Sequence, residues 1–161
     1  TVQVLLFFKY YDPNQKYLTY CGLGHIERVM TVADLMPILC EKAGLPKSTP
    51  LAIYEEEYLA TVNRINDLDK TLSDAIVDLS DGDILVFHRD DIVIDECASV
   101  KEYYTDLIHK VEVLFCDKNN PNDPGFVLEL SMKMNYTQMA DAVAMRLGTE
   151  PYLIQFFKNQ R

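Results

Sequence analysis

The chain has 161 residues, of which 48% are hydrophobic and 25% are charged, a composition typical of globular proteins and long enough for one ordinary domain or two small ones. Its formal net charge of −10 and its pI of about 4.6 disfavour nucleic acid and anionic membranes as direct partners and favour basic protein segments. No apolar stretch approaches the roughly 18 residues that a membrane span needs, and the N-terminus lacks the pattern of a signal peptide.

The first half of the sequence predicts a small domain of mixed strands and helix. Residues 2–8 and 17–26 are typical of two strands joined by a turn at Asp12-Pro13-Asn14. Thr31, with Asp34 three residues later, predicts the start of a helix that Gly44 ends. The apolar face of this helix is expected to comprise Val32, Leu35, Met36, Leu39 and Ala43.

The rest of this half is expected to complete a mixed sheet. The predicted elements are a strand at 51–54, an irregular polar segment at 58–70, a short helix or turn at 71–79 with Leu72, Ile76 and Leu79 inward, and a last strand at 83–88 with Ile84 and Val86 in the core. Glu55-Glu56-Glu57, after the third strand, either extends an acidic surface or ends the strand. A hairpin, one crossing helix and two more strands indicate the α+β class.

The second half repeats this order with a period of about 105 residues. Residues 90–99 form a charged stretch without a clear period, and residues 92–109 are predicted to connect the two copies. The second copy is expected to contain strands at 110–115, 126–130 and 152–157, and a helix between Asn135 and Gly148 with Tyr136, Met139, Ala140, Val143 and Leu147 facing inward. We therefore expect domains at 1–91 and 110–161, the second truncated after its third strand.

No catalytic residue, metal site or cofactor is predicted. The four cysteines are Cys21, Cys40, Cys97 and Cys116; they form no Cys-x-x-Cys pair, and free, mostly buried thiols in a reducing compartment are expected. The three histidines lack the spacing of metal ligands. Cys40 and Cys116 fall on predicted core faces, and the sequence shows no nucleophile with an activating base.

Several strings of residues carry a resemblance that keeps its order along nearly the whole chain. They are Leu5-Leu6-Phe7-Phe8-Lys9, Tyr20-Cys21-Gly22, Tyr54-Glu55-Glu56, Asp81-Gly82-Asp83-Ile84, Phe115-Cys116-Asp117-Lys118, Pro121-Asn122-Asp123-Pro124-Gly125-Phe126-Val127 and Gln155-Phe156-Phe157-Lys158. Together they resemble the second and third ubiquitin-like domains of the herpesvirus-associated ubiquitin-specific protease family. The resemblance implies tandem β-grasp domains from a deubiquitinase of nucleus and cytoplasm, whose cysteine protease centre lies outside this chain.

An acidic turn is the candidate binding site. Asp78, Asp81 and Asp83 bracket one predicted turn, so their carboxylates could converge on one lysine or arginine. From the residues alone, an ordinary turn on a solvated face is the favoured interpretation. The resemblance implies instead a docking site for Lys-rich motifs, with Asp78, Leu79, Ser80, Asp81 and Asp83 as partner-binding residues. Two positions depart from the family, because Val77 replaces an acid and Ser80 replaces a methionine.

The expected function is therefore a non-catalytic interaction region of a deubiquitinase. It docks Lys/Arg-rich motifs of substrates or regulators on the acidic turn and contacts other domains of the parent protease. The alternative is a rigid spacer that positions the catalytic domain and an activating tail. Two further alternatives are an enzyme in its own right and an acidic β-grasp domain that pairs with a basic copy of itself.

Overall fold

A long antiparallel hairpin forms the first part of the chain. The computed structural model describes residues 2–58 and 61–159. Strand β1 (Gln3–Asp12) pairs with β2 (Tyr17–Glu27). Because strand side chains alternate between faces, Val4, Leu6 and Phe8 of β1 all point to one side, where they are fully buried. The predicted hairpin is confirmed, and its buried face is the floor of the core.

Helix α1 (Val32–Ala43) packs on this floor. The Thr31 hydroxyl accepts a hydrogen bond from the Asp34 N–H at 3.2 Å and caps the helix. Gly44 ends it with a φ of 72°, a left-handed conformation that glycine adopts without steric cost. Both predicted helix ends are confirmed. The predicted inward face is also confirmed, with Val32, Leu35 and Leu39 fully buried and Met36 and Ala43 packed against the core.

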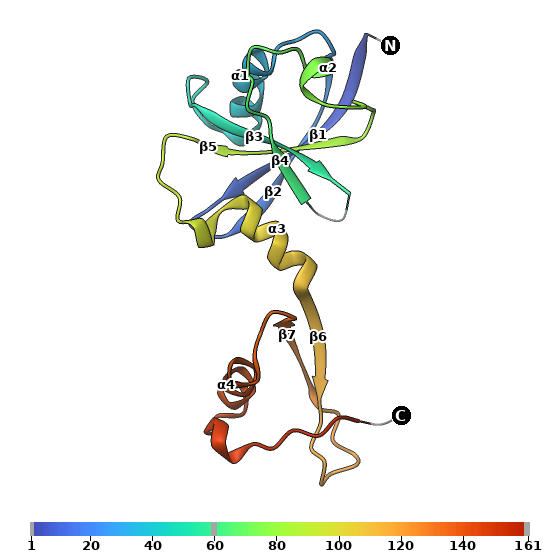
Figure 1. Ribbon diagram of the computed structural model, residues 1–161, viewed down its shortest axis with the longest axis vertical. Coiled ribbons are helices and arrows are strands. Elements are labelled where there is room, and N and C mark those ends of the chain that lie inside the picture. The colour runs from blue at the N-terminus through green and yellow to red at the C-terminus, as the bar shows by residue number, and fades with distance from the viewer. Residues whose placement is uncertain (1, 59–60, 160–161) are drawn as a thin grey trace. The chain divides into compact units, whose positions relative to one another are not determined.

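Three further strands complete a sheet in the order β2-β1-β5-β3-β4. Strand β3 (Leu51–Glu57) pairs antiparallel with β4 (Thr61–Arg64) and with β5 (Asp83–Arg89). Strand β5 follows the short helix α2 (Leu72–Ala75) and enters the centre of the sheet parallel to β1. The β-grasp arrangement consists of a hairpin, a crossing helix and a central strand parallel to the first strand of the hairpin. The structure has these elements, so the α+β class is confirmed (Figure 1).

The predicted bounds of the third strand and the segment after it were wrong. Residues 58–70 were expected to be irregular, but they contain β4, and β3 continues through Glu57. The cross-strand pairs run from Tyr54 with Arg64 to Glu57 with Thr61. A neighbouring strand that pairs with the backbone determines where a strand ends, and the polarity of these side chains gives no sign of that partner.

A helix packs on each face of this sheet. Helix α1 lies on one side and helix α3 (Val100–His109) on the other (Figure 1). Tyr11, Val62 and Val86 form a second apolar cluster with Val100 and Tyr104 of α3. The predicted core residues Ile84 and Val86 belong to this second cluster, whereas Leu85 and Phe87 of β5 face α1.

Residues 92–109 are more ordered than the predicted connecting segment. They contain a 3-10 turn, η1 (Glu96–Ala98), and α3. The Tyr11 hydroxyl donates a hydrogen bond to the Ala98 carbonyl, and Val100 and Tyr104 are buried on the sheet. The chain divides into two compact units between Thr105 and Asp106, here called unit 1 and unit 2. Most of this segment therefore packs as part of unit 1. The helical spacing of Val100, Tyr104 and Leu107 is a signal in the sequence that could have predicted α3.

Unit 2 repeats the first part of the same order. Strands β6 (Lys110–Phe115) and β7 (Phe126–Ser131) pair antiparallel, and helix α4 (Tyr136–Leu147) and a 3-10 turn, η2 (Pro151–Leu153), follow. Asn135 and Gln138 form the capping box at the start of α4, and Gly148 ends it with a φ of 67°. Both helix ends predicted in this half are confirmed.

Two other predictions for unit 2 were wrong. Residues 152–157 form no strand, although Ile154 has an extended backbone. In unit 1 the strand after the helix pairs with β5, and the described residues of unit 2 include no counterpart of β5 for this segment to join. Tyr136 and Leu147, expected to face inward, are 62% and 52% exposed. A helix of 12 residues is about 18 Å long, more than a sheet of two strands about 5 Å apart can cover.

The helices of this structure are short and mostly amphipathic. Within residues 2–58 and 61–159, none combines the length and the hydropathy of a membrane span.

Candidate functional site

The predicted acidic turn joins the end of α2 to the start of β5. The Asp83 N–H donates to the Ser80 carbonyl at 3.1 Å, and the Ser80 N–H donates to an Asp83 carboxylate oxygen at 2.9 Å. Between them Gly82 has a φ of 95°, which favours glycine strongly over other residues. The sequence Ser-Asp-Gly-Asp thus makes this turn through its own side chains, which short polar residues do well.

Asp81 attaches the turn to β1. Its carboxylate accepts a hydrogen bond from the Leu5 N–H at 2.8 Å, and the neighbouring Gly82 N–H donates to the Leu5 carbonyl at 2.8 Å. The parallel ladder between β1 and β5 begins one residue later, where Leu6 opposes Asp83. Asp81 therefore satisfies a backbone donor that the ladder does not reach. In Asp81 and in Asp83, one oxygen of the carboxylate accepts a backbone hydrogen bond.

The other three predicted site residues differ from one another. Asp78 is exposed, has a positive φ of 55°, and accepts a 2.7 Å hydrogen bond from the Ser80 hydroxyl through its carbonyl. Ser80 is exposed, whereas Leu79 is only 8% exposed and its side chain belongs to the core. The turn therefore presents the polar groups of Asp78, Ser80, Asp81 and Asp83, while the Leu79 side chain packs in the core beneath it.

Arg28 is the basic residue that touches this turn. Its guanidinium donates to the Leu79 carbonyl at 2.9 Å, and its buried Nε has no hydrogen-bond partner among the described residues. The ion pairs of unit 1 involve other acids: Lys9 with Glu56, Arg64 with Asp90, and Arg89 with Asp91. In the part of the chain that the structure describes, no salt bridge neutralises Asp78, Asp81 or Asp83.

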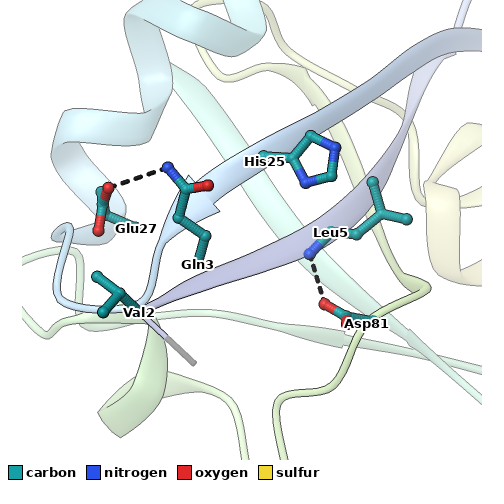
Figure 2. A pocket seen from close by; sticks show the side chains of 6 residues that line it. All are labelled: Val2, Gln3, Leu5, His25, Glu27 and Asp81. Carbon is teal, nitrogen blue, oxygen red and sulfur yellow. Dashed lines mark hydrogen bonds between the residues drawn. The ribbon is translucent and has the colours of Figure 1, made fainter.

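A surface hollow of about 590 Å³ adjoins the turn (Figure 2). Glu27 lies at one side of it and Asp81 at another, with the ends of β1 and β2 between them. The Gln3 side-chain amide donates to the Glu27 carboxylate at 3.0 Å. The lining residues are Val2, Gln3, Leu5, His25, Glu27 and Asp81. Two carboxylates and the apolar side chains of Val2 and Leu5 in one hollow suit a long basic side chain, which has an aliphatic stem and a charged end.

Sequence reasoning missed Glu27 as part of this site. Glu27 and Asp81 lie 54 positions apart in the sequence, and both are next to the start of β1 in space. The register of the hairpin places Glu27 opposite Gln3, and the Asp81 carboxylate is bonded to Leu5. Glu27 could have been identified by combining the predicted β-grasp order of strands with the register of the β1–β2 hairpin.

The three consecutive glutamates of β3 differ in their surroundings. Glu56 is paired with Lys9 at 3.1 Å, and its side chain is 13% exposed, so it serves the sheet. Burial raises the pKa of Glu55, and the nearby carboxylates of Glu57 and Asp83 raise it further. The charges of Glu55 and Asp83 therefore interact across the sheet.

The four cysteines are free thiols that differ in their burial. Cys40 is buried, but Cys97 and Cys116 are exposed, so the prediction of mostly buried thiols was wrong. Cys116 lies just after the end of β6. Burial raises the pKa of the Cys21 and Cys40 thiols, which is the opposite of what a nucleophilic cysteine needs. Among the described residues, no group of three or more His, Cys, Asp and Glu side chains is placed to hold a metal ion.

Comparison with known proteins gives one family match and several relatives. The family model described as the ICP0-binding domain of Ubiquitin-specific protease 7 matches residues 1–161. The chain is 39% identical over 154 residues to Ubiquitin carboxyl-terminal hydrolase 7 of Drosophila melanogaster, covering 95% of the chain and 14% of that protein. It is 33% identical over 152 residues to Ubiquitin carboxyl-terminal hydrolase 5 of Schizosaccharomyces pombe, covering 89% and 13%. The chain thus spans only about a seventh of these relatives.

Solved structures of other ubiquitin-like domains are more distant. The C-terminal ubiquitin-like domain of mouse tubulin-specific chaperone e is 16% identical with a TM-score of 0.43, over 58% of this chain and 92% of that one. A ubiquitin-like domain of Arabidopsis thaliana is 12% identical with a TM-score of 0.40, over 57% and 82%.

Proposed function

The chain belongs to the family of the ICP0-binding domain of ubiquitin-specific protease 7, and on this premise we propose that it is a protein-docking region of a larger deubiquitinase. The family is a non-catalytic interaction region, and the relatives are ubiquitin carboxyl-terminal hydrolases. On this proposal the hydrolysis of ubiquitin conjugates belongs to the rest of the parent protein. The partners of this chain are Lys/Arg-rich segments of substrates or regulators, ICP0 among the candidates.

The observation that carries this proposal is that the carboxylates of the turn form no salt bridge within the described chain. Asp78, Asp81 and Asp83 gather on one turn, and none forms a salt bridge with a lysine or arginine of the described chain. Hydrogen bonds between a cationic side chain and a carboxylate are short and about twice as strong as neutral ones. The chain's net charge of −10 also speeds the approach of a cationic segment.

The bonds within the turn prepare it for a ligand. Asp81 is held by the Leu5 N–H and Asp83 by the Ser80 N–H, so two carboxylates are already oriented before a partner arrives. A preorganised site loses less side-chain entropy on binding. A carboxylate that accepts one backbone hydrogen bond still has lone pairs on its second oxygen for an ammonium or guanidinium group.

The test must separate the negative charge of Asp81 and Asp83 from the backbone hydrogen bonds that their side chains accept. Asparagine keeps a side-chain carbonyl that can accept the same backbone hydrogen bonds, whereas it removes the negative charge. The experimental chain carries Asp81→Asn and Asp83→Asn. Its control carries Asp141→Asn and Glu150→Gln, two exposed acids of unit 2, and has the same net charge.

Binding of a fluorescein-labelled Lys-rich peptide is measured by fluorescence anisotropy. The turn variant is expected to bind at least about tenfold more weakly than the control, since each lost charged hydrogen bond is worth roughly 1.5–3 kcal/mol in a desolvated contact. Wild-type affinity is expected to fall steeply as NaCl rises from about 0.05 to about 0.5 M. Equal affinities of the turn variant and the control would show that the peptide binds elsewhere or responds only to net charge.

A spacer function is the second candidate, and one feature of unit 1 supports it. Val100 and Tyr104 anchor α3 on the sheet, so the residues after β5 are held in place. A spacer that only positions other domains predicts no peptide binding by either variant. It also predicts that loosening this anchor with Tyr104→Ala changes ubiquitin hydrolysis by the parent protein.

A further inference from the structure

The outward face of the β1–β2 hairpin is only partly covered by α3. Tyr11 and Leu18, a cross-strand pair at one end of the hairpin, contribute to the cluster that packs against α3. The hollow beside Asp81 lies at the other end. Because directly opposed residues of an antiparallel pair project to the same side, three intervening pairs share this outward face. They are Leu5 with His25, Phe7 with Leu23, and Lys9 with Tyr20.

The surface between these ends is apolar and exposed. Tyr20 and Leu23 are 59% and 45% exposed, Leu5 and Phe7 are half-buried, and the ring centroids of Phe7 and Tyr20 lie 6.4 Å apart. These four residues are here called the apolar strip. Lys9 shares this face, but its ammonium lies 3.1 Å from the Glu56 carboxylate, so its charge is neutralised. The strip would therefore not repel a basic segment.

Leu5 makes the apolar strip continuous with the acidic hollow. Its side chain lines the hollow together with Glu27 and Asp81, and its N–H is the donor to the Asp81 carboxylate (Figure 2). Phe7, two residues further along β1, carries the strip away from the hollow on the same face. One continuous surface therefore presents carboxylates at one end and, along the rest, aliphatic and aromatic side chains together with the paired Lys9.

We propose that the apolar strip is the second half of the docking surface, and that it binds a large apolar residue close to the lysine or arginine of the partner segment. This inference rests on the proposed docking function. Residues i and i+2 of an extended peptide lie about 6.8 Å apart on the same side, which is also the repeat along β1. A basic side chain between Glu27 and Asp81 would thus place an apolar residue two positions away over Phe7 and Leu23.

The two halves of this surface differ in their response to salt. The contact between a basic side chain and the carboxylates weakens with ionic strength, because exposed charges are screened. Burial of an apolar side chain against Tyr20 and Leu23 does not weaken in this way. A partner that uses both halves therefore binds more tightly and keeps more of its affinity in salt than a partner that offers lysines alone.

Two labelled peptides test the inference on the complete 161-residue chain. The lysine peptide has lysines separated by glycine and serine; the anchored peptide has leucine two positions after one lysine. We expect the anchored peptide to bind about three- to tenfold more tightly, as expected for partial burial of one leucine side chain. We also expect this ratio of affinities to grow as NaCl is raised.

A matched pair of variants locates the effect. Tyr20→Thr with Leu23→Thr removes the exposed part of the strip while keeping residues that suit a strand. In this variant the affinities of the two peptides are expected to become nearly equal. The control is Tyr17→Thr, because Tyr17 is also exposed, at 60%. Tyr17 opposes Asp12, one position beyond the Tyr11–Leu18 pair, and its side chain therefore lies on the opposite face of the hairpin. The control is expected to keep the preference for the anchored peptide.

Each outcome has a distinct meaning. Equal affinity of the two peptides for the wild-type chain overturns this inference and leaves the docking function standing. Absence of binding by both peptides overturns the docking function itself. A preference that survives Tyr20→Thr with Leu23→Thr places the apolar contact elsewhere and also overturns the inference. Circular dichroism of each variant confirms that unit 1 is still folded.

Discussion

The Asp81 carboxylate accepts a hydrogen bond from the Leu5 N–H at 2.8 Å, joining residues 76 positions apart in the sequence. This bond fixes the acidic turn to the first strand at the point where the β1–β5 ladder begins. It also orients a carboxylate at the edge of the hollow beside Glu27. The same side chain therefore serves the fold and the proposed docking surface, and the two roles can be separated by substitution.

Replacing Asp81 by alanine should destabilise unit 1 more than replacing it by asparagine. Alanine leaves the Leu5 N–H without its acceptor, at a cost of about 1–3 kcal/mol if water does not replace it, whereas asparagine supplies a neutral acceptor. Urea denaturation followed by circular dichroism measures the difference. Amide hydrogen exchange at Leu5 should be fastest in the alanine variant. Equal stability of the two variants would contradict a structural role for the carboxylate.

Leu79 should act on stability and not directly on binding. Its side chain packs in the core beneath the turn, so Leu79→Ala is expected to cost roughly 2–5 kcal/mol. At temperatures where the variant remains folded, its affinity for a Lys-rich peptide should stay within about threefold of wild type. Ser80→Ala, at the exposed neighbouring position, is the control for stability. A folded Leu79→Ala chain with greatly weakened binding would show that this side chain contacts the partner after all.

Tyr104 should tolerate the loss of its hydroxyl but not of its ring. The ring is buried between α3 and the sheet. Its buried hydroxyl lies near the Glu56 carboxylate but forms no hydrogen bond of ordinary length with a described residue. Burial, with the nearby Glu56 carboxylate, raises the pKa of this hydroxyl, so it stays protonated. Tyr104→Phe is expected to change the free energy of unfolding by no more than about 1 kcal/mol, whereas Tyr104→Ala should cost roughly 3–5 kcal/mol. Thermal unfolding measures both.

The stability of unit 1 should fall on mild acidification because of His88. Its Nδ1 lies 2.8 Å from the Arg89 carbonyl, which can only accept, so Nδ1 carries the proton. Its Nε2, 3.1 Å from the Tyr54 hydroxyl, then acts as the acceptor. Burial lowers the pKa of His88 in the folded state, while an unfolded histidine binds a proton near pH 6.5. The unfolded state therefore binds more protons below about pH 6.5, and stability decreases as pH falls toward the folded-state pKa.

Urea denaturation at a series of pH values between about 7.5 and 5 tests the role of His88. Replacing His88 by phenylalanine should flatten the stability profile in this range, whatever its effect on absolute stability. An identical slope in wild type and His88→Phe would assign the pH dependence to other groups.

The ends of the long helices could be predicted from the sequence because their causes are local. Thr31 and Asn135 bond to N–H groups three residues away, and Gly44 and Gly148 adopt left-handed conformations at the other ends. The acidic turn is local in the same sense, since Asp83 closes it on Ser80. Each of these features needs only a few consecutive residues, so short motifs are sufficient evidence for them.

The errors concern contacts between distant residues. Strand β4 exists because β3 lies beside it, and residues 152–157 do not form a strand because the described part of unit 2 offers them no ladder partner. Likewise, Val100 and Tyr104 of the predicted connecting segment are buried only because the sheet of unit 1 presents an apolar face to them. Neither partner can be identified from the neighbouring sequence.

The amino-acid sequence by itself determined the order of elements, the α+β class and the place of the acidic turn, since hydrophobic periodicity and capping residues are written in consecutive positions. Only the tertiary structure decided that Leu79 is core, that Glu27 joins Asp81 around one hollow, and that an apolar strip lies beside it. The physical reason is that β1 pairs with β2 on one side and with β5 on the other. The register of those two ladders, which depends on side-chain packing across the whole sheet, sets which distant residues become neighbours.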